Sequence, residues 1–543
     1  MKTKLLFNFL LVVGVSAPVV LSLNSCSSFS GNLVFANYSG YMNEDMMDEH
    51  RDVKWLTYLV DDDIMNKFAK NYDLAIPTFG TILNLVHDNK LSQVEWDRFE
   101  LTDADGNLIE SGKQAEYFLA SKSHGRNNAT DAQLIVDSIN AWLRTTEGLT
   151  WLPASYIDSL DNINNLSILD WCVPYFLSSL SFSYWGENLF DDEVTWENIA
   201  SAIRDENRFN ANQPYQKISL IDDYRTVFDM AKLYTDENDT SSTSFNINQP
   251  NDKISQNDYR DIYHNFTNQL YRSGQKSKFY LNGDSIELSN AFLGEGNKHG
   301  TGILCYNSDA VYAGIGVGQI SSEQELVYQW LGTDRDETVL MSGSTPNNTA
   351  MILDGVVFNK ELDGNEPRKT KAYEVVADFC IDGINLLDPD GEDQIYDTDE
   401  DGNYAYGVMR NFDYVLYTSP WEAIDAYALP STTADYSSYF ADLIWWLFYE
   451  ETGIGYVDET DESGYLPEAI WNKYFPDTPV EPDYISEAWV DFLSNNYQIS
   501  YPSGGLNPNG SVNIDLGLYV ELPLSALAKS NMHWAYEKTK GAY

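Results

Sequence analysis

The chain of 543 residues is poor in positive charge, and this shortage excludes one class of partner. Only 33 lysines and arginines stand against 83 aspartates and glutamates, which gives a formal net charge of −50. A field of that sign repels nucleic acid and attracts cations, so we expect no nucleic-acid partner. A solvated acidic surface accounts for much of the same charge.

Cysteine and histidine are also scarce, with four and six copies. Cys172, Cys305 and Cys380 form no CxxC pair and no zinc pattern, and the apolar sequence around Cys172 and Cys305 predicts buried free thiols. The chain has no Gly-x-Ser-x-Gly, no His-Glu-x-x-His and no P-loop. We therefore expect a non-enzyme without a cofactor, although so many carboxylates leave a glycosidase open as an alternative.

Long apolar runs are missing except at the N-terminus, from Leu5 to Leu23. This run follows a basic start and is closed by Leu23-Asn-Ser-Cys26, a layout typical of a secretory signal with a bacterial lipoprotein cysteine. We predict that residues 1–26 are a lipoprotein signal peptide, with Cys26 lipidated and the protein anchored by lipid on the extracellular face of the cell membrane. The alternative is a plain membrane-spanning anchor, because the run is just long enough to cross a bilayer.

After residue 31, strand-like and helix-like segments alternate. We expect strands at 33–37, 53–60 and 73–77, and helices at 43–50, 61–69 and 81–87. This order with short connections predicts an α/β fold, a parallel sheet with helices on both faces. Such sheets bind ligands at the C-terminal ends of their strands, where Tyr38, Tyr41, Thr78 and Phe79 follow.

The rest of the chain continues the alternation with interruptions. Strands are expected at 173–184, 217–221, 302–306 and 350–358, and helices at 196–204, 222–234, 371–384, 441–451 and 524–540. The polar and turn-rich stretches predict an irregular insertion at 102–150, a mobile loop at 235–258 and a hyperacidic loop at 388–403.

One part of the hyperacidic loop has the spacing of a calcium ligand set. Asp397, Asp399 and Asp401 occupy the first, third and fifth positions of a calcium loop, and Gly402 follows. The twelfth position holds Val408 instead of the bidentate glutamate. We therefore prefer a solvated acidic turn and keep calcium as the weaker alternative.

Five short segments, taken in order, resemble the spermidine/putrescine-binding proteins of bacterial ABC importers. They are LVFANYSGY at 33–41, YDLAIPT at 72–78, CVPY at 172–175, IDDYRTVFDMA at 221–231 and YTSP at 417–420. The third resembles the family's Ile-Pro-Tyr strand, and the fourth resembles its Asp-Asp-x-Arg-x-x-Phe helix. The resemblance implies a two-lobed periplasmic-binding-protein-like fold of type II that encloses its ligand between the lobes.

The same resemblance implies the domain organisation and the function. Lobe one would comprise 32–183 and 353–420, with an insertion near 102–150, and lobe two 184–352 and 421–543. The protein would be a lipid-anchored solute-binding protein that delivers a polyamine to the permease and ATPase subunits of an ABC transporter. A surface lipoprotein with a glycosidase-like or adhesin role is the alternative.

The site residues also come from the resemblance, carried over position by position. They are Tyr38, Tyr41, Thr78, Asp223, Tyr306, Asp354 and Tyr417. Aromatic rings would hold the methylene chain and carboxylates the ammonium groups, because an ammonium stripped of water needs a paired charge. The chain departs from the family at Thr226, where a second acidic residue is expected, and at Ile352, where a tryptophan is expected. These departures leave a different cationic ligand open.

Each candidate has a purely structural alternative. Asp223 and its neighbour Asp222 open a helix, and either can be the N-cap. Asp354 can belong to an Asp-Gly turn, and Tyr306 can be ordinary core. If the functional interpretation holds, Asp223 and Asp354 come from opposite lobes and face one cleft lined by Tyr38, Tyr41 and Tyr306.

Overall fold

The computed structural model describes eighteen stretches of the chain, and Cys26 and the helix expected at 441–451 lie outside them. The described residues are 32–126, 129–185, 195–204, 218–238, 254–269, 279–283, 285, 287–288, 302–309, 333–334, 337–338, 341–344, 349–386, 395–398, 403–429, 439, 518–520 and 523–540. Within these residues, no helix has the length and apolar character needed to cross a membrane.

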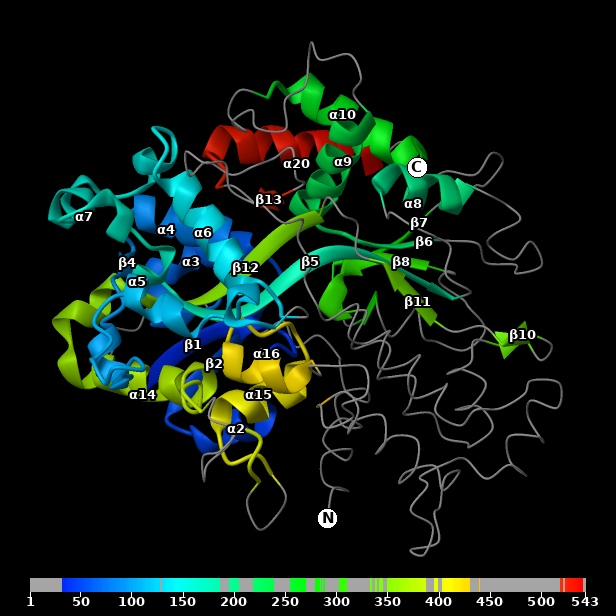
Figure 1. Cartoon of the computed structure of the whole chain (residues 1–543). Coiled ribbons are helices and arrows are strands. Elements are labelled where there is room, and N and C mark those ends of the chain that lie inside the picture. The colour runs from blue at the N-terminus through cyan, green and yellow to red at the C-terminus, as the bar shows by residue number, and fades with distance from the viewer. Residues whose placement is uncertain are drawn as a thin grey trace, which may run out of the picture.

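The first lobe is built on a parallel sheet (Figure 1). Its elements are β1 (Leu33–Tyr38), α2 (Glu44–Glu49), β2 (Val53–Tyr58), α3 (Asp61–Asn71), β3 (Leu74–Ala75) and α4 (Phe79–His87). β1 lies between β2 and β3, and its Phe35 and Ala36 are completely buried. The predicted β-α-β-α-β order is confirmed.

The second lobe repeats this arrangement with different strands. β6 (Ile218–Ile221) pairs in parallel with both β7 (Phe279–Asn282) and β8 (Gly302–Tyr306). Its helices are α8 (Trp196–Arg204), α9 (Tyr224–Asn238), α10 (Gln256–Gln269) and α20 (Ala526–Lys540). Figure 1 shows α9, α10 and α20 gathered on one side of these strands, with α20 at the red end of the chain.

Two long strands join the lobes. β5 (Val173–Trp185) and β12 (Thr349–Asn359) pair antiparallel in the middle of the sheet, whose order is β2-β1-β3-β12-β5-β8-β6-β7. The far end of β5 pairs with β8 of the second lobe, and the far end of β12 pairs with β3 of the first. The two-lobed α/β fold class is therefore confirmed, and β5 and β12 are the crossings between the lobes that the described residues contain.

β12 is irregular where it passes from one lobe to the other. Its register against β5 shifts between Asp354 and Gly355. A Cβ on Gly355 would lie 2.8 Å from the Cβ and 2.9 Å from the Sγ of Cys172, so only glycine allows the strands to approach this closely. Cys172, Cys305 and Cys380 are buried free thiols, as predicted for the first two.

Short strands and turns complete the sheet. β4 (Leu91–Ser92) and β13 (Leu518–Val520) pair with β12, and β11 (Met341–Ser344) pairs with β5. β9 (Thr333–Asp334) and β10 (Glu337–Thr338) form a separate antiparallel pair. β4, β11 and β13 thus extend the pairing of β5 and β12 and leave the two parallel triplets intact.

The irregular interpretation of residues 102–150 is wrong in its second half. This stretch contains α5 (Gly112–Ala115) and α6 (Ala132–Leu143), and α7 (Ala154–Ser159) follows it. Ile135, Ile139 and Leu143 are buried on α6 at a spacing of four residues, which is a helical signal present in the sequence. Polar residues at its start obscured that signal.

Two further boundaries differ from the prediction. α9 continues to Asn238 and α10 begins at Gln256, so helix occupies both ends of the predicted loop at 235–258. α14 (Glu366–Cys380) begins five residues before the expected helix at 371, because Asn365 caps it by accepting a hydrogen bond from the Arg368 backbone N–H.

The helices that directly follow β12 in the described chain, α14 to α16, lie against the first lobe. α15 (Gly407–Val415) precedes α16 (Glu422–Ala428), which we expected in lobe two. Arg126 donates to the carboxylates of Glu422 and Asp425 at 2.8 Å each, which ties α16 to first-lobe residues. The exact domain boundaries stay predictions.

Candidate ligand-binding cleft

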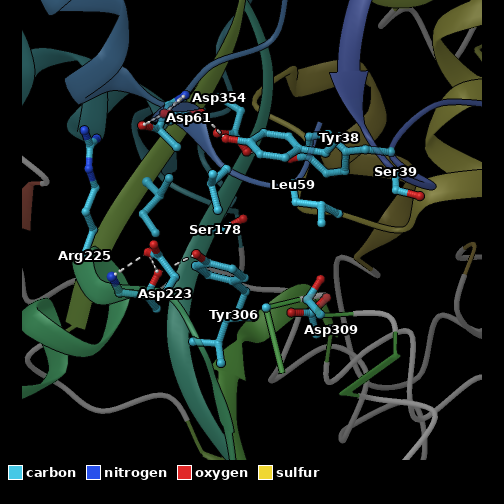
Figure 2. Close-up of a pocket in the computed structure, with 18 of the residues that line it drawn as sticks. Tyr38, Ser39, Leu59, Asp61, Ser178, Asp223, Arg225, Tyr306, Asp309 and Asp354 are labelled. Carbon is cyan, nitrogen blue, oxygen red and sulfur yellow. Dashed lines mark hydrogen bonds between the residues drawn. The ribbon is translucent and has the colours of Figure 1, made fainter. Parts of the chain in front are cut away.

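A cavity of about 170 Å³ opens between the lobes. A single water occupies about 10–15 Å³ of such a volume, which counts the space open to the centre of a water molecule. The cavity therefore has room for a small organic molecule. All seven site residues predicted from the sequence line it: Tyr38, Tyr41, Thr78, Asp223, Tyr306, Asp354 and Tyr417. Figure 2 shows Asp61 and Asp354 on one side of this pocket and Asp223 and Tyr306 on the other. Their role in binding stays a prediction.

The topology of the sheet explains why distant residues meet here. Tyr38 ends β1 and Thr78 follows β3, while Tyr306 ends β8 and Asp223 follows β6. In each lobe the parallel strands point their C-terminal ends toward the same edge, where loops leave the sheet. Asp354 reaches the pocket from the middle of the crossing strand β12.

The first-lobe wall is organised around Asp61, which is 7% exposed. Its carboxylate accepts hydrogen bonds from the Tyr38 hydroxyl, from Thr78 Oγ1 at 2.6 Å and from the Thr78 backbone N–H at 3.2 Å. Burial, with the charge of Asp61 next in size, raises the pKa of the Tyr38 hydroxyl well above its ordinary value. Tyr38 therefore remains a hydrogen-bond donor at neutral pH.

A second tyrosine–carboxylate pair links the first lobe to the crossing strand. The Tyr41 hydroxyl donates to Asp354 Oδ2 at 2.6 Å, across 313 residues of sequence. The Tyr41 ring meets the Tyr417 ring edge to face, with 4.8 Å between centroids. Burial raises the pKa of Tyr41, and the charge of Asp354 adds to the increase. Asp354 is thus held by a neutral donor, directly before the register shift of β12.

The second-lobe wall contains Asp223 at the start of α9. Its Oδ2 accepts from the Thr226 backbone N–H at 2.9 Å and from Thr226 Oγ1 at 2.7 Å, which is helix N-capping geometry. Thr226 Oγ1 lies 2.7 Å from the Tyr306 hydroxyl. Burial raises the pKa of the Asp223 carboxyl. Asp223 is therefore both a helix cap and a pocket residue, so the two interpretations are compatible.

The sequence analysis missed four aspartates that line the same pocket: Asp61, Asp62, Asp229 and Asp309. Asp309 is buried and accepts from the Tyr417 hydroxyl at 2.8 Å. Two of the four had a signal in the sequence, because Asp61 and Asp309 come within three residues of the ends of β2 and β8. Applying the strand-end rule to every strand, and not only to the aromatic positions, would have found them.

The described lining of the pocket is strongly anionic. Six aspartates contribute to it, and Arg225 is the one lysine or arginine among the described lining residues. Tyrosine rings, with Ile221 and Ile352, supply the apolar surface between the carboxylates. Carboxylates separated by rings and aliphatic side chains can bind ammonium groups and pack against the methylenes that connect them.

The calcium alternative lies largely outside the described residues. Asp397 is described, but Asp399 and Asp401 are not. Across the described stretches, no three His, Cys, Asp or Glu side chains gather where they could hold a metal ion. Calcium at the hyperacidic loop therefore stays a prediction.

A family model for hypothetical lipoproteins (MG045 family) matches residues 1–438. The chain belongs to this lipoprotein family. No curated protein matches it.

Solved structures similar to the chain include two assigned to spermidine/putrescine ABC transporters and one lipoprotein. A protein from Listeria monocytogenes assigned as a spermidine/putrescine ABC transporter is 13% identical, with 95% of this chain and 100% of that chain covered and a TM-score of 0.44. The substrate-binding protein PotD from Streptococcus pneumoniae is 12% identical, with coverages of 94% and 99% and a TM-score of 0.41. The lipoprotein TpPotD of Treponema pallidum is 11% identical, with coverages of 64% and 79% and a TM-score of 0.35.

Proposed function

We propose that this lipoprotein is the solute-binding component of an ABC importer and that it binds a linear polycation of the polyamine kind between its lobes. The observation that carries the proposal is the composition of the pocket lining. Among the described residues it has six aspartates and several tyrosines but a single arginine. A buried ammonium group needs a carboxylate partner, and a buried carboxylate needs a cation in return.

The placement of the carboxylates supports a ligand whose charges lie at separate points. Asp61 belongs to the first lobe, Asp354 to a crossing strand and Asp223 to the second lobe. A ligand that contacts all three bridges the lobes, so its binding stabilises the closed arrangement over an open one. The closed protein would then present the ligand to the permease and ATPase subunits of the transporter.

The anchor completes the proposal. Lipidation of Cys26 would hold the protein on the extracellular face of the membrane, near its permease. Cys26→Ser should abolish both lipid attachment and signal cleavage, as read by mass spectrometry of the membrane fraction. A mutant that still matures to the same lipidated mass would show that the anchor is elsewhere.

Titration calorimetry on the full-length chain in detergent tests the ligand. Putrescine, spermidine and spermine should bind, whereas neutral sugars should not, and Asp354→Asn should weaken polyamine binding by the cost of a desolvated ammonium without its partner, on the order of 2–5 kcal/mol. Thiamine serves as a cationic ligand of another shape. Polyamine affinity unchanged in both Asp354→Asn and Asp223→Asn would refute the site, and hydrolysis of a sugar would favour the glycosidase-like alternative.

A further inference from the structure

A second aspartate of α3 makes contacts that cross between the lobes. The Asp62 carboxylate lies 2.5 Å from Lys529 Nζ and 3.5 Å from Arg225 Nη2. The Tyr224 hydroxyl lies 3.2 Å and 3.3 Å from its two oxygens. Asp62 belongs to the first lobe, whereas all three partners stand on α9 and α20 of the second lobe.

Arg225 strengthens this connection from the second lobe. Arg225 is 7% exposed, and its Nη1 donates to Thr81 Oγ1 at 3.3 Å. Thr81 stands on α4, so Arg225 reaches two helices of the first lobe. Figure 2 shows Arg225 rising from the backbone beside Asp223, with its guanidinium extending toward the side of the pocket that carries Asp61. A buried guanidinium that contacts both lobes depends on their closed arrangement for its partners.

The chain contains a matched ion pair that stays within one lobe. Lys540 Nζ on α20 lies 2.8 Å from Asp222 Oδ1, beside α9. The side chains of Lys540 and Asp222 are 26% and 27% exposed, and those of Lys529 and Asp62 are 26% and 32% exposed. Both ion pairs join a lysine of α20 to an aspartate, and their side chains are similarly exposed. They differ in that the Lys529–Asp62 pair connects the two lobes, whereas the Lys540–Asp222 pair lies within the second lobe.

We propose that Asp62, Arg225 and Lys529 form a latch between the lobes, which stabilises the closed arrangement and so increases the affinity of the pocket for its ligand. The cationic ligand used below rests on the proposed function, but the latch itself does not. A ligand that binds the closed protein has an apparent affinity proportional to the closed fraction. Lys529 and Arg225 are therefore positioning residues, which act through that fraction.

The sign of one mutational effect separates a latch from a simple charge effect. Lys529 is a cation at the rim of an anionic pocket, so removal of its charge should strengthen the binding of a cationic ligand if only the electrostatic field matters. Loss of a latch should weaken the same binding. The two explanations thus predict opposite changes for Lys529→Met.

Calorimetric titration of spermidine into full-length Lys529→Met measures this sign. We expect binding about three- to tenfold weaker than in the wild type, the size of a modest coupling energy, and no weakening in Lys540→Met. Asp62→Asn in the Lys529→Met background should add less than it does alone, because both changes break the same pair. Unchanged or tighter binding in Lys529→Met would overturn the latch.

Distances between spin labels on the two lobes give a readout that needs no ligand. Labels at Asn71→Cys on α3 and Asn257→Cys on α10 suit this test, because both positions are exposed and Cys172, Cys305 and Cys380 are buried. In the ligand-free protein, Lys529→Met should lengthen or broaden the interlobe distance, and Lys540→Met should not.

The two readouts distinguish the failures. If wild-type protein does not bind spermidine but Lys529→Met shifts the distance, the proposed ligand is wrong and the latch stands. If spermidine binds and neither its affinity nor the distance responds to Lys529→Met, the latch is wrong and the ligand stands.

Discussion

The junctions from β2 to α3 and from β6 to α9 use the same device in the two lobes. Each carries adjacent aspartates, which are Asp61, Asp62 and Asp63 in the first lobe and Asp222 and Asp223 in the second. Asp61 and Asp223 line the pocket and accept hydrogen bonds from hydroxyl groups. Their neighbours Asp62 and Asp222 each meet a lysine of α20, and Asp62 also lines the pocket.

The junctions differ in what holds the inner carboxylate. Asp223 is held by Thr226 in the first turn of its own helix, three residues away. Asp61 is held by Tyr38, which ends β1, and by Thr78, which follows β3. Because α20 belongs to the second lobe, the lysine contact lies within that lobe at one junction and crosses the cleft at the other. The same feature, adjacent aspartates between a strand and a helix, therefore contributes to local stability in the second lobe and to contact between the lobes in the first.

The largest expected effect separates Asp61 and Asp223, which accept hydrogen bonds from hydroxyl groups in the pocket, from Asp222. Asp61→Asn and Asp223→Asn should each weaken polyamine binding by on the order of 2–5 kcal/mol, because each leaves a desolvated ammonium without its carboxylate. Asparagine can still cap α9, so Asp223→Asn should fold. Asp222→Asn, the outer control, should lose less than about 1 kcal/mol. Equal losses at Asp222 and Asp223 in calorimetry would contradict the division of roles.

A smaller effect should distinguish the hydroxyl partners of the two walls. Tyr38→Phe removes a donor to the Asp61 carboxylate and should lower the free energy of unfolding by about 1–3 kcal/mol. Tyr306→Phe removes a neutral contact with Thr226, while Asp223 keeps both bonds from Thr226, so the loss should be about 0.5–1.5 kcal/mol. Urea unfolding of both variants measures the difference, and the reverse order would contradict this ranking.

The pH dependence of binding should be specific to the second-lobe junction. Burial raises the pKa of Asp223, so this carboxyl takes up a proton at a higher pH than an ordinary aspartate. Polyamine affinity should therefore fall as the pH decreases from 7 toward that raised pKa, by less than about 1.4 kcal/mol per pH unit for one proton. Calorimetry in two buffers of different ionisation enthalpy should detect proton uptake by Asp223 in the free protein and proton release on binding.

Asp223→Asn is the control for that pH effect, and it should flatten the profile. In the unliganded protein the pH affects folding stability in the direction opposite to its effect on polyamine affinity. The folded state binds this proton more tightly than the unfolded state, so the contribution of Asp223 to stability is present at low pH and is lost as the pH rises through the raised pKa. A profile that stays equally steep in Asp223→Asn would assign it to another group.

The smallest effect concerns the outer pair of the second lobe. Lys540→Met should lower the free energy of unfolding by no more than about 1 kcal/mol, because the Lys540–Asp222 pair is partly exposed and screened by salt. Lys538→Met, which removes the same charge from an exposed position of α20, should change stability by less than about 0.5 kcal/mol. Thermal unfolding at low and high salt compares the stabilities of the two variants. A larger loss of stability in Lys538→Met than in Lys540→Met would contradict this prediction.

Much of the fold could be predicted from local patterns. The helix at Trp196–Arg204 and the strand at Gly302–Tyr306 have the bounds expected from their apolar spacing. Where the prediction failed, two local patterns indicated different structures, and the one we followed was wrong. The polar start of residues 102–150 suggested a loop, although the regular spacing of Ile135, Ile139 and Leu143 on α6 gives helix. Family resemblance, and not pattern alone, selected the seven pocket residues.

By itself, the sequence determined the alternation of strands and helices, the shortage of positive charge and the pairs of aspartates at strand ends, because each depends on neighbours in the chain. Only the tertiary structure decided that Asp62 and Asp222 meet lysines of α20. It also joined Tyr41 to Asp354 across 313 residues. Such contacts depend on the register of β5 and β12 and on the closure of the lobes, and no local pattern of residues encodes either one.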